Sequence, residues 1–455
     1  MSSPILRRKA YNALKQWKDS DLGSTAVLVS GARRTGKSFL VRMFAENEYR
    51  SYILVDFMRV PPRIKESFLN DAGDLNLLYN KLSLEYGVRL YPRESAIVFD
   101  EVELFPRARE IVKVLVEDGR FDIIETGSLL SIKTNVEGIL IPSEESEIIL
   151  NPLDFEEFLW ALGDDSSVPL MREFYERRQP LGEGPHKRIM NLYRQYMLVG
   201  GMPQAVLAYV ENHEFRDVDK KKRDILRLYR EDAAKYAGAN RISVESIFDT
   251  IPGMLNSKDK RFSESSLVKD PKSRGFNDSF MWLCDSRVVN PCFNSTDPSI
   301  GLGIYSDRAS MKLYMADTGL LVTHAVSELG MDADRVYADL LMDRMNLNEG
   351  MFAENLVAQA LVANGRRLFF YSRSDPDTRR NSIEIDFLVM KDGKVRPLEV
   401  KSSKSTKHVS LDKFMERFGK RIGQPVILCL KDIEERDGIL YLPIYMSMFL
   451  RRRRS

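Results

Sequence analysis

The chain has 455 residues, which at about 150 residues per domain predicts about three domains that each bury a core. Its 68 Lys and Arg residues nearly balance 66 Asp and Glu residues, and the net charge of +2 excludes a histone-like polycation and an acidic tail protein. Hydrophobic residues make up 44% and charged residues 29%, as in a folded globular protein.

Cysteines and histidines are few, at three and four, and their scatter favours neither a disulfide framework nor a zinc cluster. We find no apolar run of the roughly 18 residues that span a bilayer, and the first residues lack the apolar core of a signal peptide. The sequence therefore predicts a cytoplasmic protein with reduced thiols and no membrane partner.

The first third of the chain predicts strands that alternate with helices. Residues 25–30 form an apolar strand pattern, residues 31–38 a turn bounded by glycines, and residues 39–47 a helical pattern. Further strands are predicted at 52–57, 96–100 and 122–127. Strands alternating with helices favour an α/β fold with a parallel sheet covered on both faces.

The glycine-bounded turn fits the pattern G-x-x-x-x-G-K-[ST]. The glycines let backbone N–H groups surround phosphate oxygens at a helix N-terminus, where an anion is favoured. Lys37 would reach the β- and γ-phosphates, and the hydroxyl of Ser38 would ligate Mg²⁺. Chance matches occur in roughly 1–2% of chains of this length. The predicted nucleotide-binding residues are Gly31, Ala32, Arg33, Arg34, Thr35, Gly36, Lys37, Ser38 and Phe39.

Two adjacent carboxylates, Asp100 and Glu101, end the strand at 96–100, as in a Walker B element. One carboxylate, Asp100, would hold Mg²⁺ through water, and Glu101 would polarise the attacking water. The next strand ends in Thr126 and Ser128, whose hydroxyls either sense the γ-phosphate or only complete a strand-end turn.

From residue 154 the pattern becomes helical. Apolar spacing predicts a helix after Asp154, Pro203 suits the first position of another helix, and residues 221–237 predict a third. Residues from about 240 to 325 then show three short helical patterns followed by strand-like pieces at 288–293 and 312–315, the element order of a winged helix. The helix expected over 276–285 has no Lys or Arg, which favours a structural spacer over a DNA-reading helix.

A second group of charged residues lies near the C-terminus. Alternation along a strand places Glu399 and Lys401 on one face, and a hairpin brings Asp386 beside them. Glu354, on the preceding helix, either reaches this site or faces solvent. Such carboxylates would hold Mg²⁺ for phosphodiester hydrolysis, with the lysine orienting water. Three interpretations stay open: a nuclease, a site that binds nucleic acid or metal without cutting, and a solvated surface.

Six segments in order, GARRTGKSFL, IVFDEVELFP, ETGSLL, NPLDFEEFLWALG, YMLVGGMPQAV and KLYMADTGLL, resemble prokaryotic AAA-type ATPases with a C-terminal domain of unknown function related to restriction endonucleases. The resemblance covers nearly the whole chain. It departs at Glu103, where relatives usually carry Gln, and at Ser38, where Thr is commoner. The domains expected are an AAA-type P-loop core (1–160), a helical lid (161–239), a winged-helix-like domain (240–330) and a restriction-endonuclease-like α/β domain (331–455).

These observations predict an ATP- and Mg²⁺-dependent ATPase whose nucleotide state controls a nuclease-like domain. The alternative is a nucleotide-controlled switch or scaffold whose C-terminal domain only recognises a nucleic-acid or protein partner. Preference for ATP over GTP rests on the resemblance. A homo-oligomer is expected if a neighbouring subunit supplies an arginine to the transferring phosphoryl group, for which the candidates are Arg107, Arg109, Arg120, Arg33 and Arg34.

Overall fold

The computed structural model describes residues 5–128, 145–236, 241–257, 260–261, 274–298, 301–327, 333–342, 349–373, 382–402 and 407–451. The chain divides into two compact units. The N-terminal unit comprises Arg7–Asn151 with Asp285–Arg287, and the C-terminal unit comprises Met1–Leu6, Pro152–Cys284 and Val288–Ser455. No helix among the described residues is long and apolar enough to cross a membrane.

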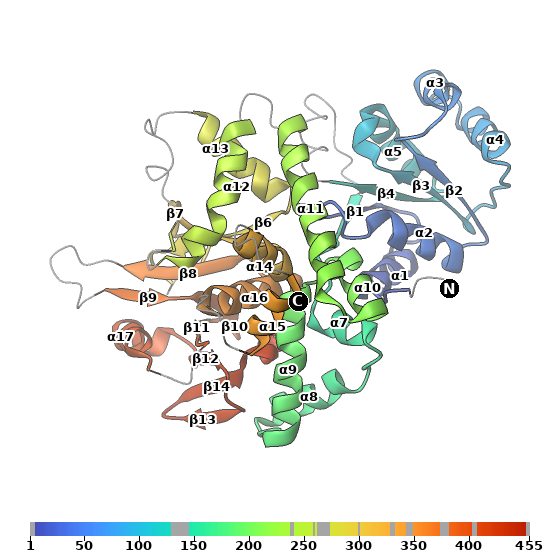
Figure 1. The fold of residues 1–455 in the computed structure, drawn as a ribbon. Coiled ribbons are helices and arrows are strands. Elements are labelled where there is room, and N and C mark those ends of the chain that lie inside the picture. Colours follow the sequence, from blue (N-terminus) through green and yellow to red (C-terminus); the bar gives the residue numbers. More distant parts are fainter. Residues whose placement is uncertain are drawn as a thin grey trace. The chain divides into compact units, whose positions relative to one another are not determined.

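A parallel sheet forms the centre of the N-terminal unit, with strand order β2-β3-β4-β1-β5 among the described residues (Figure 1). The strands are β1 (Ala26–Ser30), β2 (Ser51–Asp56), β3 (Ser95–Asp100), β4 (Asp122–Gly127) and β5 (Glu145–Ile149). The helices are α1 (Lys9–Asp21), α2 (Lys37–Glu48), α3 (Pro62–Asn70), α4 (Leu75–Tyr86) and α5 (Pro106–Asp118). The parallel sheet and the strands β1 to β4 are therefore confirmed.

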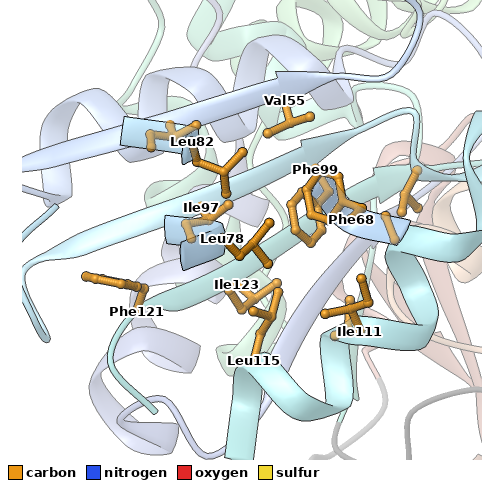
Figure 2. Close-up of a cluster of buried hydrophobic side chains, with 14 of the residues drawn as sticks. Val55, Phe68, Leu78, Leu82, Ile97, Phe99, Ile111, Leu115, Phe121 and Ile123 are labelled. Atoms are coloured by element: carbon orange, nitrogen blue, oxygen red, sulfur yellow. The ribbon is translucent and has the colours of Figure 1, made fainter. Parts of the chain in front are cut away.

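Both faces of this sheet are covered because alternate residues of a strand point to opposite sides. On one face, Ile97 and Phe99 of β3 pack with side chains of α3, α4 and α5 (Figure 2). On the other face, Ala96 and Val98 pack with side chains of α1 and α2, among them Phe44. Burying each large apolar side chain stabilises the fold by about 1.5–3 kcal/mol. The buried strands β1 and β3 accordingly contain the unbroken apolar runs AVLV and AIVF.

The C-terminal unit begins with helices that have clear sequence signals. Asp154 and Glu157 form a capping box at the start of the first helix, and Pro203 occupies the first turn of a later one. The first of these helices lies in the C-terminal unit, since the boundary between the units falls after residue 151. The helices are α7 (Phe155–Ala161), α8 (Ser167–Arg177), α9 (Glu183–Val199), α10 (Pro203–Asn212), α11 (Phe215–Tyr236), α12 (Arg241–Asn256) and α13 (Arg274–Asp285).

The rest of this unit contains two sheets among the described residues, with orders β7-β6-β8-β9 and β10-β11-β12-β14-β13. Their strands are β6 (Val289–Ser295), β7 (Ser306–Met315), β8 (Leu368–Arg373), β9 (Ile383–Ile385), β10 (Phe387–Lys391), β11 (Lys394–Val400), β12 (Val426–Cys429), β13 (Glu434–Arg436) and β14 (Ile439–Pro443). The accompanying helices are α14 (Thr318–Val326), α15 (Ala333–Leu341), α16 (Glu349–Ala363) and α17 (Val409–Phe418).

The predicted winged-helix-like domain is not confirmed. Strands β6 and β7 do pair antiparallel, as expected for the two strand-like pieces. However, β6 also pairs in parallel with β8, so the hairpin belongs to a sheet that continues beyond the predicted boundary at residue 330. This pairing uses the second hydrogen-bonding edge of β6, for which a local pattern gives no signal. Part of the expected helical pattern, at 262–273, lies outside the described residues.

A buried polar network joins the two glycine-containing segments GGMP and ADTG of the C-terminal unit. The Asp317 carboxylate accepts the N–H of Gly201 at 2.5 Å and that of Leu320 at 2.9 Å. Nearby, the Lys222 ammonium donates to the carbonyls of Leu198 and Gly319. A Cβ on Gly319 would lie 2.5 Å from the Val199 carbonyl oxygen, so only glycine permits this approach. These segments of the resemblance therefore have a structural role.

Candidate functional site

The glycine-bounded turn connects the end of β1 to the start of α2. Gly36 precedes the helix with φ 93°, a left-handed conformation that glycine adopts readily. Lys37 is the first helical residue and is 6% exposed. Its Nζ donates to the carbonyl oxygens of Gly31 and Ala32, both at 3.2 Å. The lysine is thus folded back over the turn, where a phosphate would be surrounded by backbone N–H groups.

Arg8 supports this turn, and the sequence analysis missed it. Its guanidinium donates to the Thr35 carbonyl at 2.9 Å and to the Asn151 carbonyl at 2.5 Å. A Cβ on Gly31 would lie 2.4 Å from the carbonyl oxygen of Leu150, so the turn also packs tightly against the chain that follows β5. Arginine is common enough that a position 23 residues before the turn carries no recognisable signal.

Asp100 and Glu101 lie where parallel strands bring their carboxyl ends together. Phe99 of β3 is opposite Glu125 of β4, which places Thr126 beside Asp100. The Thr126 hydroxyl donates to the Asp100 carboxylate, and the N–H of Glu101 donates to the same hydroxyl oxygen at 3.1 Å. Glu101 has φ 54° and is half-buried, whereas Thr126 is fully buried. The predicted residues Asp100, Glu101 and Thr126 are therefore brought together, and Thr126 orients the two acids.

Burial and the neighbouring acids have opposite effects on the pKa of Lys37. Burial lowers the pKa of Lys37, and the nearby carboxylates of Glu101, Glu103 and Asp100 act in the other direction. A buried ammonium with several acids close by is suited to a phosphate group and a divalent cation that would share the site. Ser38 is partly exposed at the start of α2, and Phe39 is 56% exposed beside it.

These residues fit a nucleoside triphosphate with Mg²⁺. The turn carries the ammonium and the N–H groups that phosphates require, while Ser38 and Asp100 carry the hydroxyl and carboxylate oxygens that Mg²⁺ prefers. Lys37 also lies within the electrostatic reach of Asp100 and Glu101, which links the turn to the end of β3.

The candidate arginines differ in their surroundings. Arg107 is exposed and pairs with Glu110, and Arg120 pairs with Asp118 at 2.8 Å. The side chain of Arg109 is only 2% exposed, and it pairs with Glu145 of β5 at 2.6 Å and with Glu125 of β4 at 3.4 Å. Arg109 is therefore buried within its own unit, which does not suit the predicted role of an arginine supplied to a neighbouring subunit.

In the C-terminal unit, Asp386 lies between β9 and β10 and its carboxylate accepts the N–H of Val400 at 2.8 Å. Strands β10 and β11 pair antiparallel, which confirms the predicted hairpin. Asp386 separates β9 from β10, and these two strands belong to different sheets. Lys401 donates to the Glu399 carboxylate. Asp386 is thus anchored to the strand that carries Glu399.

Glu354 of α16 is buried and does not face solvent, at 5% exposure. Lys260 donates to one of its oxygens, and the Tyr314 hydroxyl donates to the other at 3.1 Å. A second lysine, Lys312, is fully buried and pairs with Glu384 at 2.7 Å. Sequence reasoning missed Lys260, Lys312 and Tyr314.

Burial and like charges perturb these acids strongly. Burial and the neighbouring Glu354 raise the pKa of Asp386 to about 7, against the influence of Lys312 and Lys260. Burial would also raise the pKa of Glu354, but Lys312 and Lys260 outweigh it and hold that pKa below its ordinary value. The two lysines therefore supply the positive charge around which Glu354 and Asp386 are arranged.

Among the described residues, no group of three or more His, Cys, Asp or Glu side chains is placed to hold a metal ion. In this arrangement Lys260 and Tyr314 donate to the two carboxylate oxygens of Glu354, and Lys401 donates to one carboxylate oxygen of Glu399. The assignment of Glu354, Asp386 and Glu399 as metal ligands stays a prediction.

Three family models match parts of the chain. Residues 23–159 match an AAA domain, residues 190–334 match a domain of unknown function (DUF8612), and residues 349–446 match a second domain of unknown function (DUF4143). The first match supports an AAA-type, nucleotide-binding ATPase domain in the N-terminal unit. Neither of the other two carries a function or a relation to restriction endonucleases.

The chain is only weakly similar to the individual proteins that match it. An uncharacterized protein of Haemophilus influenzae is 27% identical over 216 residues, and the match covers 46% of this chain and 46% of that relative, so the chain spans about half its length. Cdc6p from Pyrobaculum aerophilum is 14% identical over 76% of this chain and 98% of its own, with a TM-score of 0.27. A STAND ATPase with a tetratricopeptide repeat sensor from Pyrococcus horikoshii is 10% identical over 80% of this chain and 50% of its own, with a TM-score of 0.26. Likenesses this weak carry no argument about fold or function.

Proposed function

We propose that the N-terminal unit binds ATP with Mg²⁺ and hydrolyses it. The observation that carries the proposal is the meeting of Lys37, Asp100, Glu101 and Thr126 at the carboxyl ends of parallel strands. Ligands of open parallel sheets bind at this edge. The match of residues 23–159 to an AAA domain supports the same assignment.

Each residue then has a definite task. The N–H groups of the turn and the Lys37 ammonium bind the phosphates, and Ser38 and Asp100 hold Mg²⁺, which when bound neutralises charge on the β- and γ-phosphates. Glu101 orients the attacking water and accepts its proton, and Thr126 fixes the backbone of Glu101. Arg8 keeps the turn in place from outside the site.

Lys37→Ala tests nucleotide binding. We expect ATP affinity to fall roughly 10²-fold, because charged hydrogen bonds of about 1.5–3 kcal/mol to the phosphates are lost. The matched control is Lys113→Ala, since that lysine is 54% exposed and pairs only weakly, at 3.9 Å, with an exposed glutamate. Titration with fluorescent ATP measures both. Equal affinity of Lys37→Ala and wild type would end the assignment of the turn.

We further propose that the nucleotide state controls the C-terminal unit as an effector. Cleavage of nucleic acid by Asp386, Glu399 and Lys401 is one role, and recognition of a nucleic-acid or protein partner without cleavage is the other. The pairing of Glu354 with Lys260, and of Glu399 with Lys401, favours recognition, because those carboxylate oxygens already have cationic partners. A homo-oligomer in which one subunit supplies an arginine to another remains a further prediction. Arg33 and Arg34 are the candidates for that arginine that are exposed on the turn itself.

A nuclease assay separates the two roles. Wild type, Lys401→Ala and Asp386→Ala are incubated with Mg²⁺ or Mn²⁺ and with single-stranded DNA, double-stranded DNA or RNA. Under the recognition role, wild type leaves every substrate intact. Under the cleavage role, wild type cuts at least one substrate, and both variants lose cleavage while they keep ATP hydrolysis. Cutting by Lys401→Ala at the wild-type rate would show that cleavage does not use these residues.

A further inference from the structure

Exposed basic side chains gather near the turn between β10 and β11 of the C-terminal unit. Lys394 begins β11, and Arg417 lies in the last turn of α17. Lys420 and Arg421 lie in the short 3-10 turn that follows this helix, Gly419–Arg421. All four side chains are exposed. These four residues are called the basic surface below.

Backbone contacts hold the start of β11 beside the end of α17. The Lys394 ammonium donates to the Lys420 carbonyl oxygen at 3.3 Å, and the Gly423 N–H donates to the Val395 carbonyl oxygen at 2.7 Å. Phe414 of α17 is buried in the same hydrophobic cluster as Val395. The fold itself therefore brings these basic residues together from two separate segments.

The basic surface differs from the rest of this unit in how its charges are paired. Among the described residues, no acid forms an ion pair with any of its four members, although the exposed acids Asp392 and Glu416 are close in the sequence. Other exposed arginines of the unit do pair, such as Arg177 with Glu173 at 2.7 Å. Like charges held close together without acids repel one another, so an anion bound here would be stabilised.

The phosphate backbone of a nucleic acid matches this surface in charge and in length. Each strand of a duplex carries one negative charge about every 3.4 Å, and Lys and Arg neutralise those charges in complexes with proteins. Strand β11 runs from Lys394 to Glu399, a length of about 17 Å at roughly 3.4 Å per residue. About five base pairs of a duplex span that length. A nucleic acid on the basic surface therefore reaches the candidate site at Glu399 and Lys401.

We propose that the basic surface binds the phosphate backbone of a nucleic acid and directs it towards Glu399 and Lys401. The inference rests on the proposed function, in which the C-terminal unit acts on or recognises a partner, and it identifies that partner as nucleic acid. Contacts to phosphates carry no sequence information. Binding should therefore depend strongly on salt and only weakly on base sequence.

Fluorescence anisotropy with labelled single-stranded DNA, double-stranded DNA and RNA tests the proposal. The assay contains EDTA and no ATP, so that neither metal-dependent cleavage nor ATP hydrolysis affects the result. Wild type should bind at least one of these probes. With four phosphate contacts, its affinity should fall about 10²-fold as the salt concentration rises from about 50 to about 200 mM.

Two variants of the basic surface separate charge from structure. Lys394→Ala/Lys420→Ala/Arg421→Ala removes three of the four charges, so affinity should fall at least ~10-fold at low salt and the slope of log affinity against log salt should become shallower by about 3. Lys394→Arg/Lys420→Arg/Arg421→Lys keeps every charge and should bind within about 3-fold of wild type. Thermal melts check that both variants are folded.

The matched control removes three exposed arginines of the same unit that each pair with an acid, in the variant Arg177→Ala/Arg188→Ala/Arg227→Ala. Its net charge changes as much as that of the alanine variant, yet its affinity should stay within about 3-fold of wild type because salt screens distant charges.

Four outcomes overturn the inference: no binding of any probe by wild type, wild-type affinity in the alanine variant of the basic surface, an equal loss in the control, or tighter binding to vesicles of anionic lipid than to nucleic acid. None of them concerns the nucleotide site. A failure of the proposed ATP hydrolysis shows separately, as absence of phosphate release from ATP.

Discussion

Glu101→Gln is expected to slow ATP hydrolysis at least ~10²-fold while ATP still binds. Glutamine keeps the size of the side chain but cannot accept the proton of the attacking water. The bonds of Thr126 to Asp100 and to the Glu101 N–H do not involve this side chain and should persist. Phosphate release under single-turnover conditions measures the rate, and titration with labelled ATP measures the affinity.

Glu94→Gln is the matched control for this substitution. Glu94 immediately precedes β3 and pairs with Arg50 at the surface, where both side chains are 55% exposed. Its replacement should leave the hydrolysis rate unchanged. Turnover of Glu101→Gln at the wild-type rate would mean that another group accepts the proton, and loss of ATP binding would mean that Glu101 holds the nucleotide rather than the water.

Lys312→Met should cause the largest loss of stability in the C-terminal unit. Lys312 is fully buried, pairs with Glu384, and is attracted by Glu354 and Asp386. Removing the lysine leaves the negative charges of the neighbouring acids without a buried partner. The free energy of unfolding should therefore fall by about 3–5 kcal/mol. Urea unfolding followed by circular dichroism measures the change.

Lys394→Met provides the comparison, because Lys394 is an exposed lysine on β11 whose ammonium donates only at the surface, to the Lys420 carbonyl. Its replacement should change the free energy of unfolding by no more than about 0.5 kcal/mol. Equal unfolding curves for the two variants would contradict the buried pairing of Lys312 with these acids.

The arrangement of the candidate nucleotide site was predictable because its signals are local and its assembly follows from topology. Apolar runs mark β1, β3 and β4, and parallel strands bring their carboxyl ends to one edge, so Asp100, Glu101 and Thr126 meet without any further information. Strand β5 was not predicted, because its sequence ESEII begins with three polar residues and has no apolar run long enough to indicate a strand. Its acids pair with Arg109 and Arg287, which only the folded chain brings near.

The C-terminal cluster was predictable only in part. The β10–β11 hairpin is a local element, and Asp386 before it accepts the N–H of Val400, the residue between Glu399 and Lys401. The partners of Glu354, in contrast, come from 94 residues away at Lys260 and 40 residues away at Tyr314. Such contacts depend on sheet order, and the parallel pairing of β6 with β8 that sets this order leaves no periodic signal in the sequence.

Steady-state phosphate release from ATP by the wild-type protein tests the central claim most directly. With Mg²⁺ present, wild type should release phosphate continuously, and excess EDTA should stop the release because the charge on the phosphates is no longer neutralised. Lys37→Ala, assayed in parallel, should release phosphate no faster than a blank without protein. No release by wild type with Mg²⁺, or equal release by wild type and Lys37→Ala, would contradict ATP hydrolysis at the turn between β1 and α2.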